Sequence, residues 1–106
     1  MCEKQIEQYL VKKVKELGGK AYKFVSPGND GVPDRLVCFP GGVVKFVELK
    51  APGKKPSMIQ LKQHSDLEKL GHEVWIIDSL EGVNSFISIM SFFCKPKKEA
   101  GDLVGI

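Results

Sequence analysis

The sequence predicts an α/β fold: one mixed central β-sheet flanked by helices, in the order α-β-β-β-α-β-α. Three observations lead to this fold class. The 106 residues, 42% of them hydrophobic, suit a single domain with one core. Apolar residues recur at helical spacing in some segments and at strand spacing in others. Stretches rich in glycine and proline separate these segments, and the chain has no internal repeat and no room for a second domain.

The first half of the chain predicts one helix followed by three strands. Leu10, Val14 and Leu17 recur at steps of four and three, which is the spacing of one helix face, and Gly18-Gly19 ends the helix. Because the turn Pro40-Gly41-Gly42 is short, the strands on either side of it are expected to pair antiparallel as a hairpin. The predicted bounds are 3–18 for the helix, 21–25, 34–39 and 43–50 for the strands, and 26–33 for a loop of turn-forming residues.

The second half predicts a helix, a strand and a last helix. Ser57 suits a helix N-cap, and Gln60 three residues later completes a capping-box pattern. Because a helix joins the fourth strand to the third, these two strands are expected to lie parallel, with the fourth buried. The predicted bounds are 58–70 for the helix, 73–78 for the strand and 80–92 for a last helix capped by Ser79. Residues 1–94 would form the domain, and residues 95–106 a basic, flexible tail.

Composition narrows the class of protein. The net charge is +3, from 16 basic against 13 acidic residues, which permits a polyanionic partner. Three widely spaced cysteines without a CxxC pattern argue against a disulfide framework and a structural zinc site. The N-terminus is polar and lacks the pattern of a signal peptide, and the apolar runs are too short to cross a bilayer. We therefore expect a cytoplasmic protein without membrane contact.

Charged residues gather at one predicted edge of the sheet. Glu48 and Lys50 are two apart on a strand, so they leave the same side of the sheet. Folding about the hairpin turn brings Asp34 level with Glu48. Two carboxylates placed close together repel unless a cation lies between them, and oxygen ligands suit Mg²⁺ or Mn²⁺. A lysine beside such a metal can activate a water or stabilise charge on a phosphate.

These residues resemble a known nuclease signature. Pro33-Asp34 followed by Glu48-Leu49-Lys50 is similar to the PD-(D/E)XK motif, and the wider strings GVPDR and FVELKA, with Gln60 on the next helix, resemble the virus-type replication–repair nuclease (VRR-NUC) branch. The resemblance spans roughly residues 3–90 and implies a restriction-endonuclease-like fold. It also implies individual roles: Asp34 and Glu48 as side-chain metal ligands, Leu49 as a carbonyl ligand, Lys50 as the residue that positions the attacking water, and Gln60 as a contact to metal-bound water or the scissile phosphate.

The resemblance further implies an acidic residue on the first helix near the metal. Glu3 and Glu7 continue the apolar stripe of that helix, and we favour Glu7, the deeper of the two, with Glu3 as the alternative. Simpler interpretations remain open at this point. Glu7 can be a solvated helix charge, Gln60 only a capping residue, and Glu48 with Lys50 an ordinary exposed ion pair.

Several polar residues near this edge are candidates for contacts with DNA. Phosphate contacts supply affinity without reading sequence, and the loop after Lys50 is basic. Arg35 is either structural or in contact with the DNA backbone. The two histidines, His64 and His72, have no partners at metal-binding spacing and are interpreted as a helix-face and a turn residue. The candidate DNA-binding residues are Lys54, Lys55, Lys23, Ser26, Asn29 and Arg35.

The leading functional hypothesis is a Mg²⁺- or Mn²⁺-dependent endonuclease that hydrolyses DNA phosphodiester bonds. Stand-alone members of the branch resemble Holliday-junction resolvases, which implies a homodimer that acts on branched DNA in replication, repair or recombination, in a phage or bacterial setting. The alternative is a non-catalytic nucleic-acid-binding module with a nuclease-like fold. The two differ in metal-dependent cleavage, which only the enzyme would show.

Overall fold

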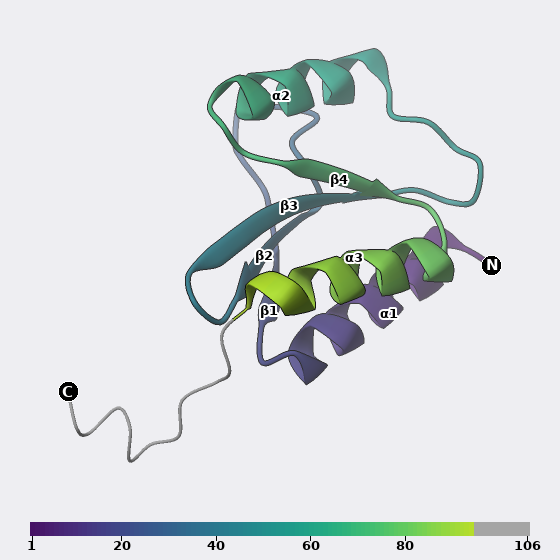
Figure 1. Cartoon of the computed structure of the whole chain (residues 1–106). Coiled ribbons are helices and arrows are strands. Elements are labelled where there is room, and N and C mark those ends of the chain that lie inside the picture. Colours follow the sequence, from purple (N-terminus) through teal and green to yellow (C-terminus); the bar gives the residue numbers. More distant parts are fainter. Residues whose placement is uncertain (95–106) are drawn as a thin grey trace.

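In the part of the chain that the structure describes, four strands and three helices follow one another in the order that the sequence predicts. The computed structural model describes residues 1–94, so the tail predicted over 95–106 lies outside the described residues. The helices are α1 (Glu3–Glu16), α2 (Met58–Lys69) and α3 (Leu80–Phe93), and the strands are β1 (Lys20–Lys23), β2 (Arg35–Phe39), β3 (Val43–Leu49) and β4 (Val74–Ile77) (Figure 1). The bounds differ from the predicted ones by a few residues at most. The chain has a mixed α/β fold.

The sheet is mixed, with strand order β1-β2-β3-β4. β2 pairs antiparallel with both β1 and β3, and β4 pairs parallel with β3, which confirms the predicted hairpin and the predicted crossover. The hairpin turn works because Gly41 and Gly42 both take positive φ, 87° and 79°, a conformation that residues with a Cβ avoid.

Helices cover the two faces of the sheet unequally. α1 and α3 lie together on one face, and α2 lies alone on the other (Figure 1). The core fills the first interface, where the helix stripe Ile6, Leu10 and Val14 meets inward-facing strand residues and the buried residues of α3. A hydrogen bond of 2.7 Å from the Tyr9 hydroxyl to Asn84 Oδ1 joins α1 to α3. This face carries most of the apolar burial.

One predicted feature of the sheet is wrong. The fourth strand was expected to be buried, but β4 is an edge strand and Ile76 is 48% exposed. One face of β4 meets α3, where the ring centroids of Trp75 and Phe86 lie 5.0 Å apart. The opposite face points toward α2, which covers it only in part, since Val74 is half-buried and Ile76 is exposed. A continuous apolar run does not distinguish a strand buried on both faces from one buried on a single face.

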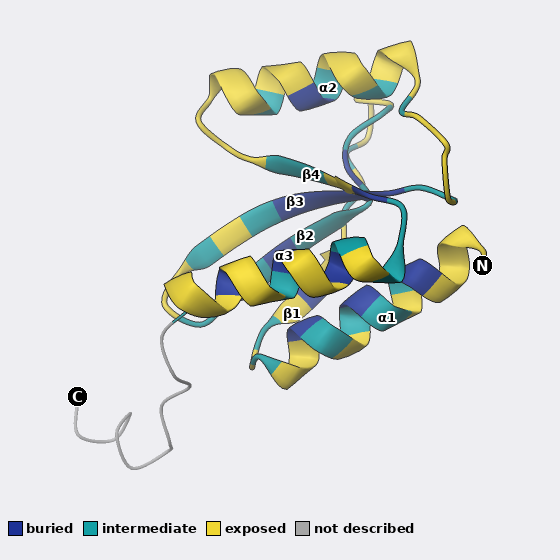
Figure 2. Ribbon diagram, turned by 45° about the vertical axis from the view of Figure 1, so that its right-hand side comes forward, coloured by how far each residue is buried: buried dark blue, intermediate teal, exposed yellow. Residues whose placement is uncertain are grey.

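α2 is exposed along most of its length (Figure 2). His64 is its one buried residue, with 2% of its surface accessible. Within residues 1–94, no helix combines the length and the apolar character needed to cross a bilayer. α2 therefore does not close a second apolar core, and its buried contact with the rest of the molecule is polar.

Candidate active site

The polar residues predicted at the end of the hairpin meet in the structure. The pairing of Arg35 with Val47 sets the register, and Asp34, one position before β2, then lies beside the end of β3. Asp34 Oδ2 accepts a hydrogen bond of 2.8 Å from the backbone N–H of Leu49. This bond fixes one oxygen of the Asp34 carboxylate and holds it next to the Glu48–Leu49 peptide.

Glu48 is the centre of the cluster. Its side chain is 1% exposed, although it is a carboxylate. Its Oε2 accepts a hydrogen bond of 2.8 Å from Gln60 Nε2 and lies 3.4 Å from Lys50 Nζ. The other oxygen, Oε1, is buried without a hydrogen-bond partner. Strand alternation thus places Glu48 and Lys50 on the same side of the sheet, but as members of a buried cluster and not as an exposed ion pair.

The surroundings make the charged form of Glu48 unfavourable. Burial, and next the negative charge of Asp34, raise the pKa of Glu48 from 4.5 to about 7, although Lys50 acts in the opposite direction. A divalent cation between the two carboxylates would remove this penalty, and the unpartnered Oε1 offers it a ligand. Within residues 1–94, no three His, Cys, Asp or Glu side chains gather as a metal-binding group. The side-chain donors that the cluster offers are the two carboxylates of Asp34 and Glu48, and carboxylate oxygens are ligands that Mg²⁺ and Mn²⁺ accept.

Gln60 caps its helix, as one of the two sequence interpretations predicts, and it also contacts Glu48. The Gln60 side-chain Oε1 accepts from the backbone N–H of Ser57 at 2.9 Å. The Gln60 backbone N–H donates to Ser57 Oγ at 3.3 Å, and the two bonds form the capping box of α2. Its Nε2 is then free to donate to Glu48. One amide therefore both caps the helix and anchors the helix start to the buried carboxylate.

Gly31, in the loop before Asp34, allows this start of α2 to approach closely. It has a φ of +91°, and a Cβ at this position would lie 2.8 Å from the carbonyl oxygen of Ile59. Only glycine combines that backbone conformation with that contact. The loop over 26–33 and the first turn of α2 are thereby packed together beside the site.

The two acidic candidates on α1 have different surroundings. Glu7 Oε2 accepts a hydrogen bond of 3.0 Å from Arg35 Nε, so Glu7 is paired with β2 and not with the Glu48 cluster. Glu3, at the start of the helix, lies close enough for its negative charge to add to the rise in the pKa of Glu48. The structure thus brings Asp34, Glu48, Lys50 and Gln60 together, and it directs Glu7 elsewhere.

The candidate DNA-binding residues divide into two groups. Lys54, Lys55 and Lys23 are exposed and free to meet a ligand. Arg35 uses its guanidinium inside the protein, where it binds Glu7 and donates to the carbonyl of Ala21 at 3.0 Å. The remaining two, Ser26 and Asn29, bond to each other across a turn, with 2.8 Å between Asn29 Nδ2 and Ser26 Oγ.

The loop that carries Lys54 and Lys55 begins directly at the site. The backbone N–H of Gly53 donates to Asp78 Oδ2 at 3.1 Å, just beyond the end of β4. This bond ties the loop to the same sheet edge that carries Glu48. The start of the loop is therefore fixed at the end of the sheet where Glu48 lies.

His64 is the site residue that the sequence reasoning missed. Its Nε2 lies 3.8 Å from the unpartnered Oε1 of Glu48, and neither ring nitrogen has a hydrogen-bond partner. Burial lowers the pKa of His64, so the ring is neutral at neutral pH. The spacing of four from Gln60 places both side chains on one helix face, and this signal was available in the sequence.

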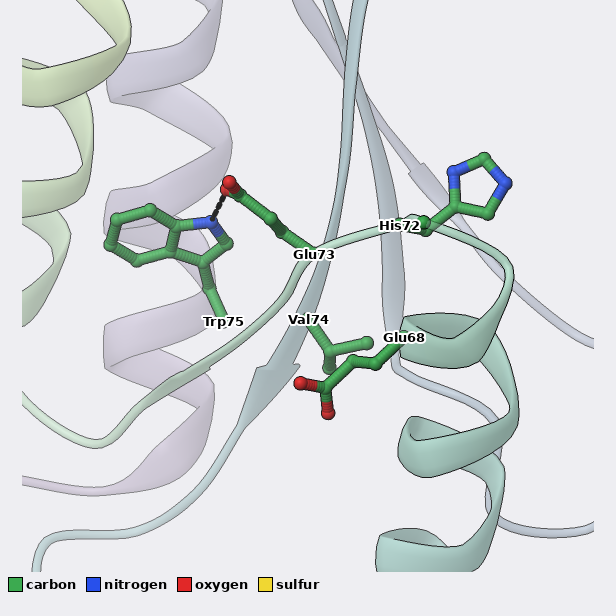
Figure 3. Close-up of a pocket in the computed structure, with 6 residues that line it drawn as sticks. Glu68, His72, Glu73, Val74 and Trp75 are labelled. Atoms are coloured by element: carbon green, nitrogen blue, oxygen red, sulfur yellow. Dashed lines mark hydrogen bonds between the residues drawn. The ribbon is translucent and has the colours of Figure 1, made fainter.

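The other histidine lies apart from the cluster. His72 lines a shallow hollow at the end of α2, where its ring points away from the carboxylates of Glu68 and Glu73 (Figure 3). Glu73 in turn accepts from Trp75 Nε1 at 3.1 Å and pairs with Lys45 at 3.1 Å. This hollow therefore brings no set of ligands together.

Known proteins resemble this chain in sequence and in fold. No family model matches the chain. Over 77 residues it is 57% identical to the protein named "Putative nuclease p44" of Acyrthosiphon pisum secondary endosymbiont phage 1, a match that covers 73% of this chain and 83% of the phage protein. A solved structure described as "VRR_NUC domain" superimposes with a TM-score of 0.77 at 34% identity, over 81% of this chain and 94% of that one. A second, "VRR_NUC domain protein", is 17% identical with a TM-score of 0.62 over 83% and 86% of the two chains, and shows the shared fold.

Proposed function

The chain belongs to the VRR-NUC family, and from this premise we propose that it is a divalent-metal-dependent endonuclease that hydrolyses DNA phosphodiester bonds. One observation carries the proposal. A buried glutamate, Glu48, has one oxygen without a partner and lies between a second carboxylate and a lysine. A structural role does not require such a costly arrangement, whereas a metal-dependent hydrolytic site does.

In this proposal the carboxylates of Asp34 and Glu48 and the carbonyl of Leu49 hold Mg²⁺ or Mn²⁺. When bound, the metal lowers the pKa of a water and polarises the phosphate. Gln60 fixes the orientation of Glu48 through its bond to Oε2. Lys50, within reach of the same oxygen, holds the attacking water or stabilises the negative charge that grows on the phosphate.

We assign the acidic contribution of the first helix to Glu3 in preference to Glu7. The charge of Glu3 acts on Glu48, while Glu7 is committed to Arg35. Glu3 is also exposed at the start of its helix, so its side chain is free to turn toward a bound cation or its water. In this assignment Glu7 has a structural role.

DNA would approach along the loops that border the site. Lys54 and Lys55 follow the catalytic strand directly, and Lys23 is exposed at the end of β1. These side chains would contact phosphates without reading bases, and the polar loop with Ser26 and Asn29 would let the backbone approach a strand. Binding should therefore weaken steeply as the salt concentration rises.

We further propose a homodimer that acts on branched DNA, including four-way junctions, in replication, repair or recombination. A domain of this size covers little DNA alone, and the near-symmetry of a junction matches a two-fold dimer. Light scattering at micromolar concentration should give the mass of two chains. A monomer at that concentration would contradict the dimer.

A panel of labelled substrates tests the proposed function. Linear duplex, flap, fork and four-way DNA are incubated with Mg²⁺, with Mn²⁺ and with a chelator. The wild type should cut branched substrates faster than linear duplex, and only with metal. Lys50→Ala should lower the rate by 10² or more, whereas Lys45→Ala, at a lysine of β3 outside the site, should cut normally. Salt-sensitive binding without any metal-dependent cleavage would instead identify a non-catalytic binding module.

A further inference from the structure

The only side chain that α2 buries is an imidazole. The helix leaves Met58, Ile59 and Leu61 exposed and places His64 inside, at 2% exposure. A helix that served only to cover the sheet would bury an apolar residue there. The burial of His64 therefore has to be explained by what the ring meets.

The ring meets the free oxygen of Glu48. Among residues 1–94, the buried side-chain polar atoms without a hydrogen-bond partner are Glu48 Oε1 and the two ring nitrogens of His64. Two of these three atoms, Oε1 and Nε2, lie 3.8 Å apart. An unsatisfied buried polar group costs about 1–3 kcal/mol. Such groups are rare in folded proteins, so their placement opposite one another indicates a shared role.

We propose that His64 is a positioning residue that holds the Glu48 carboxylate for the metal by donating its Nε2–H to Oε1. This proposal rests on the proposed function and assigns a residue to the same site. Gln60 and Lys50 interact with Oε2. With His64 donating to Oε1, both oxygens of the Glu48 carboxylate have a partner. A movement of less than about 1 Å brings the pair from 3.8 Å to hydrogen-bond distance.

The hydrogen bond and metal binding are compatible. Each carboxylate oxygen has two lone pairs, so Oε1 can accept from His64 and still bind a cation. Partners behind a metal ligand fix its orientation, and their loss lowers metal affinity by about 10- to 100-fold. His64 acts here as a neutral donor, so the role requires no change in its protonation.

Calorimetric titration with Mn²⁺ at about pH 8, without DNA, tests the proposal. His64→Leu should weaken Mn²⁺ binding about tenfold or more, and a cooperative thermal unfolding transition shows that the variant is folded. His64→Gln, which restores an N–H donor, should recover most of the affinity. His72→Leu, the matched control at the exposed histidine, should bind Mn²⁺ like the wild type.

Each outcome separates this proposal from the proposed function. If the wild type binds Mn²⁺ and a folded His64→Leu binds it within about twofold, the positioning role is wrong while the nuclease proposal stands. If the wild type binds no Mn²⁺, the proposed function fails and this role fails with it.

A second measurement does not depend on a variant that folds. Nitrogen NMR of the metal-free wild type at about pH 8 should show the His64 ring with its proton on Nε2. A ring with its proton on Nδ1 would overturn the proposal, because Nε2 would then have no hydrogen to donate.

Discussion

At the scale of single residues, Glu48 combines two features that seldom occur together. It is almost fully buried, and one of its oxygens has no partner. The fold therefore carries an electrostatic cost at this position that a metal would relieve. Proteins commonly hold such unfavourable groups where they act, at the expense of stability.

The pKa of Glu48 predicts how the stability of the metal-free protein depends on pH. Because the pKa is raised from 4.5 to about 7, the folded protein keeps a proton that the unfolded chain releases in this range, so the fold loses stability as pH rises. At about 1.4 kcal/mol per pKa unit, the loss is on the order of 3 kcal/mol.

Glu48→Gln should lack this loss. Denaturant unfolding at pH 5 and pH 8 should show the variant gaining stability over the wild type as pH rises. The contribution of His64 is largely common to both proteins and so cancels in the difference. A difference that stays constant with pH would contradict the buried, proton-binding Glu48.

Variants of the two glutamates of α1 should differ in which property they lose, stability or metal-dependent cleavage. Glu7→Gln removes the ion pair with the largely buried Arg35 and should cost about 1–2 kcal/mol of unfolding free energy with Mn²⁺ affinity retained. Glu3→Gln should leave stability unchanged and lower metal-dependent cleavage. Calorimetry, denaturation and cleavage rates on both variants check this, and the reverse pattern would return the role to Glu7.

The residue scale is also where the sequence was least informative. The pairing of Asp34 with Glu48 followed from strand alternation and the hairpin, because both are short-range geometric rules. The choice between Glu7 and Glu3 did not follow from these rules, because both lie on the same helical stripe. They are distinguished only by the position of Arg35, which pairs with Glu7. The dual role of Gln60 was likewise hidden, since a cap and a site contact use different ends of one amide.

At the scale of elements, the packing of the loop over 26–33 on the first turn of α2 decides where Gln60 lies. Gly31→Ala would place a Cβ 2.8 Å from the Ile59 carbonyl and should lower both stability and cleavage, because it pushes Gln60 away from Glu48. Gly28→Ala is the matched control, since Gly28 has a similar φ of +82° with nothing within 4 Å.

The two variants share the cost of a strained backbone, so the excess loss in Gly31→Ala measures the contact itself. Thermal unfolding and cleavage rates give both values. Equal effects in the two variants would show that the loop does not hold α2 in place.

The sequence predicted the elements well because caps, turn glycines and periodic apolar residues are local signals. It failed on β4 and on His64 for a common reason. Both lie on the α2 side of the sheet, where burial depends on how far one helix stands from the sheet and not on the pattern of the helix itself. No local rule sets that distance.

At the scale of the whole molecule, the two faces of the sheet have different roles, one in stability and the other in the proposed chemistry. The face under α1 and α3 holds the apolar core, and the face under α2 holds the polar cluster. Phe86→Ala, in the core, should therefore cost about 3–5 kcal/mol of unfolding free energy. Phe92→Ala, on the same helix but 84% exposed, should change it by less than about 0.5 kcal/mol.

Denaturant unfolding of the two variants checks this division. A large loss in Phe92→Ala would mean that the exposed end of α3 is covered in solution. That result would favour an assembly of chains at this surface.

In the proposed function, the carboxylates of Asp34 and Glu48 make this chain a metal-dependent nuclease. The most direct test is the initial rate of cleavage of labelled branched DNA in Mn²⁺, compared between Glu48→Gln and Glu73→Gln. Both positions pair with a lysine, but Glu73 lies outside the cluster. We expect a rate at least 10² lower for Glu48→Gln and an unchanged rate for Glu73→Gln, with no cleavage by any variant after chelation. Wild-type rates in Glu48→Gln, or cleavage that persists in the chelator, would contradict it.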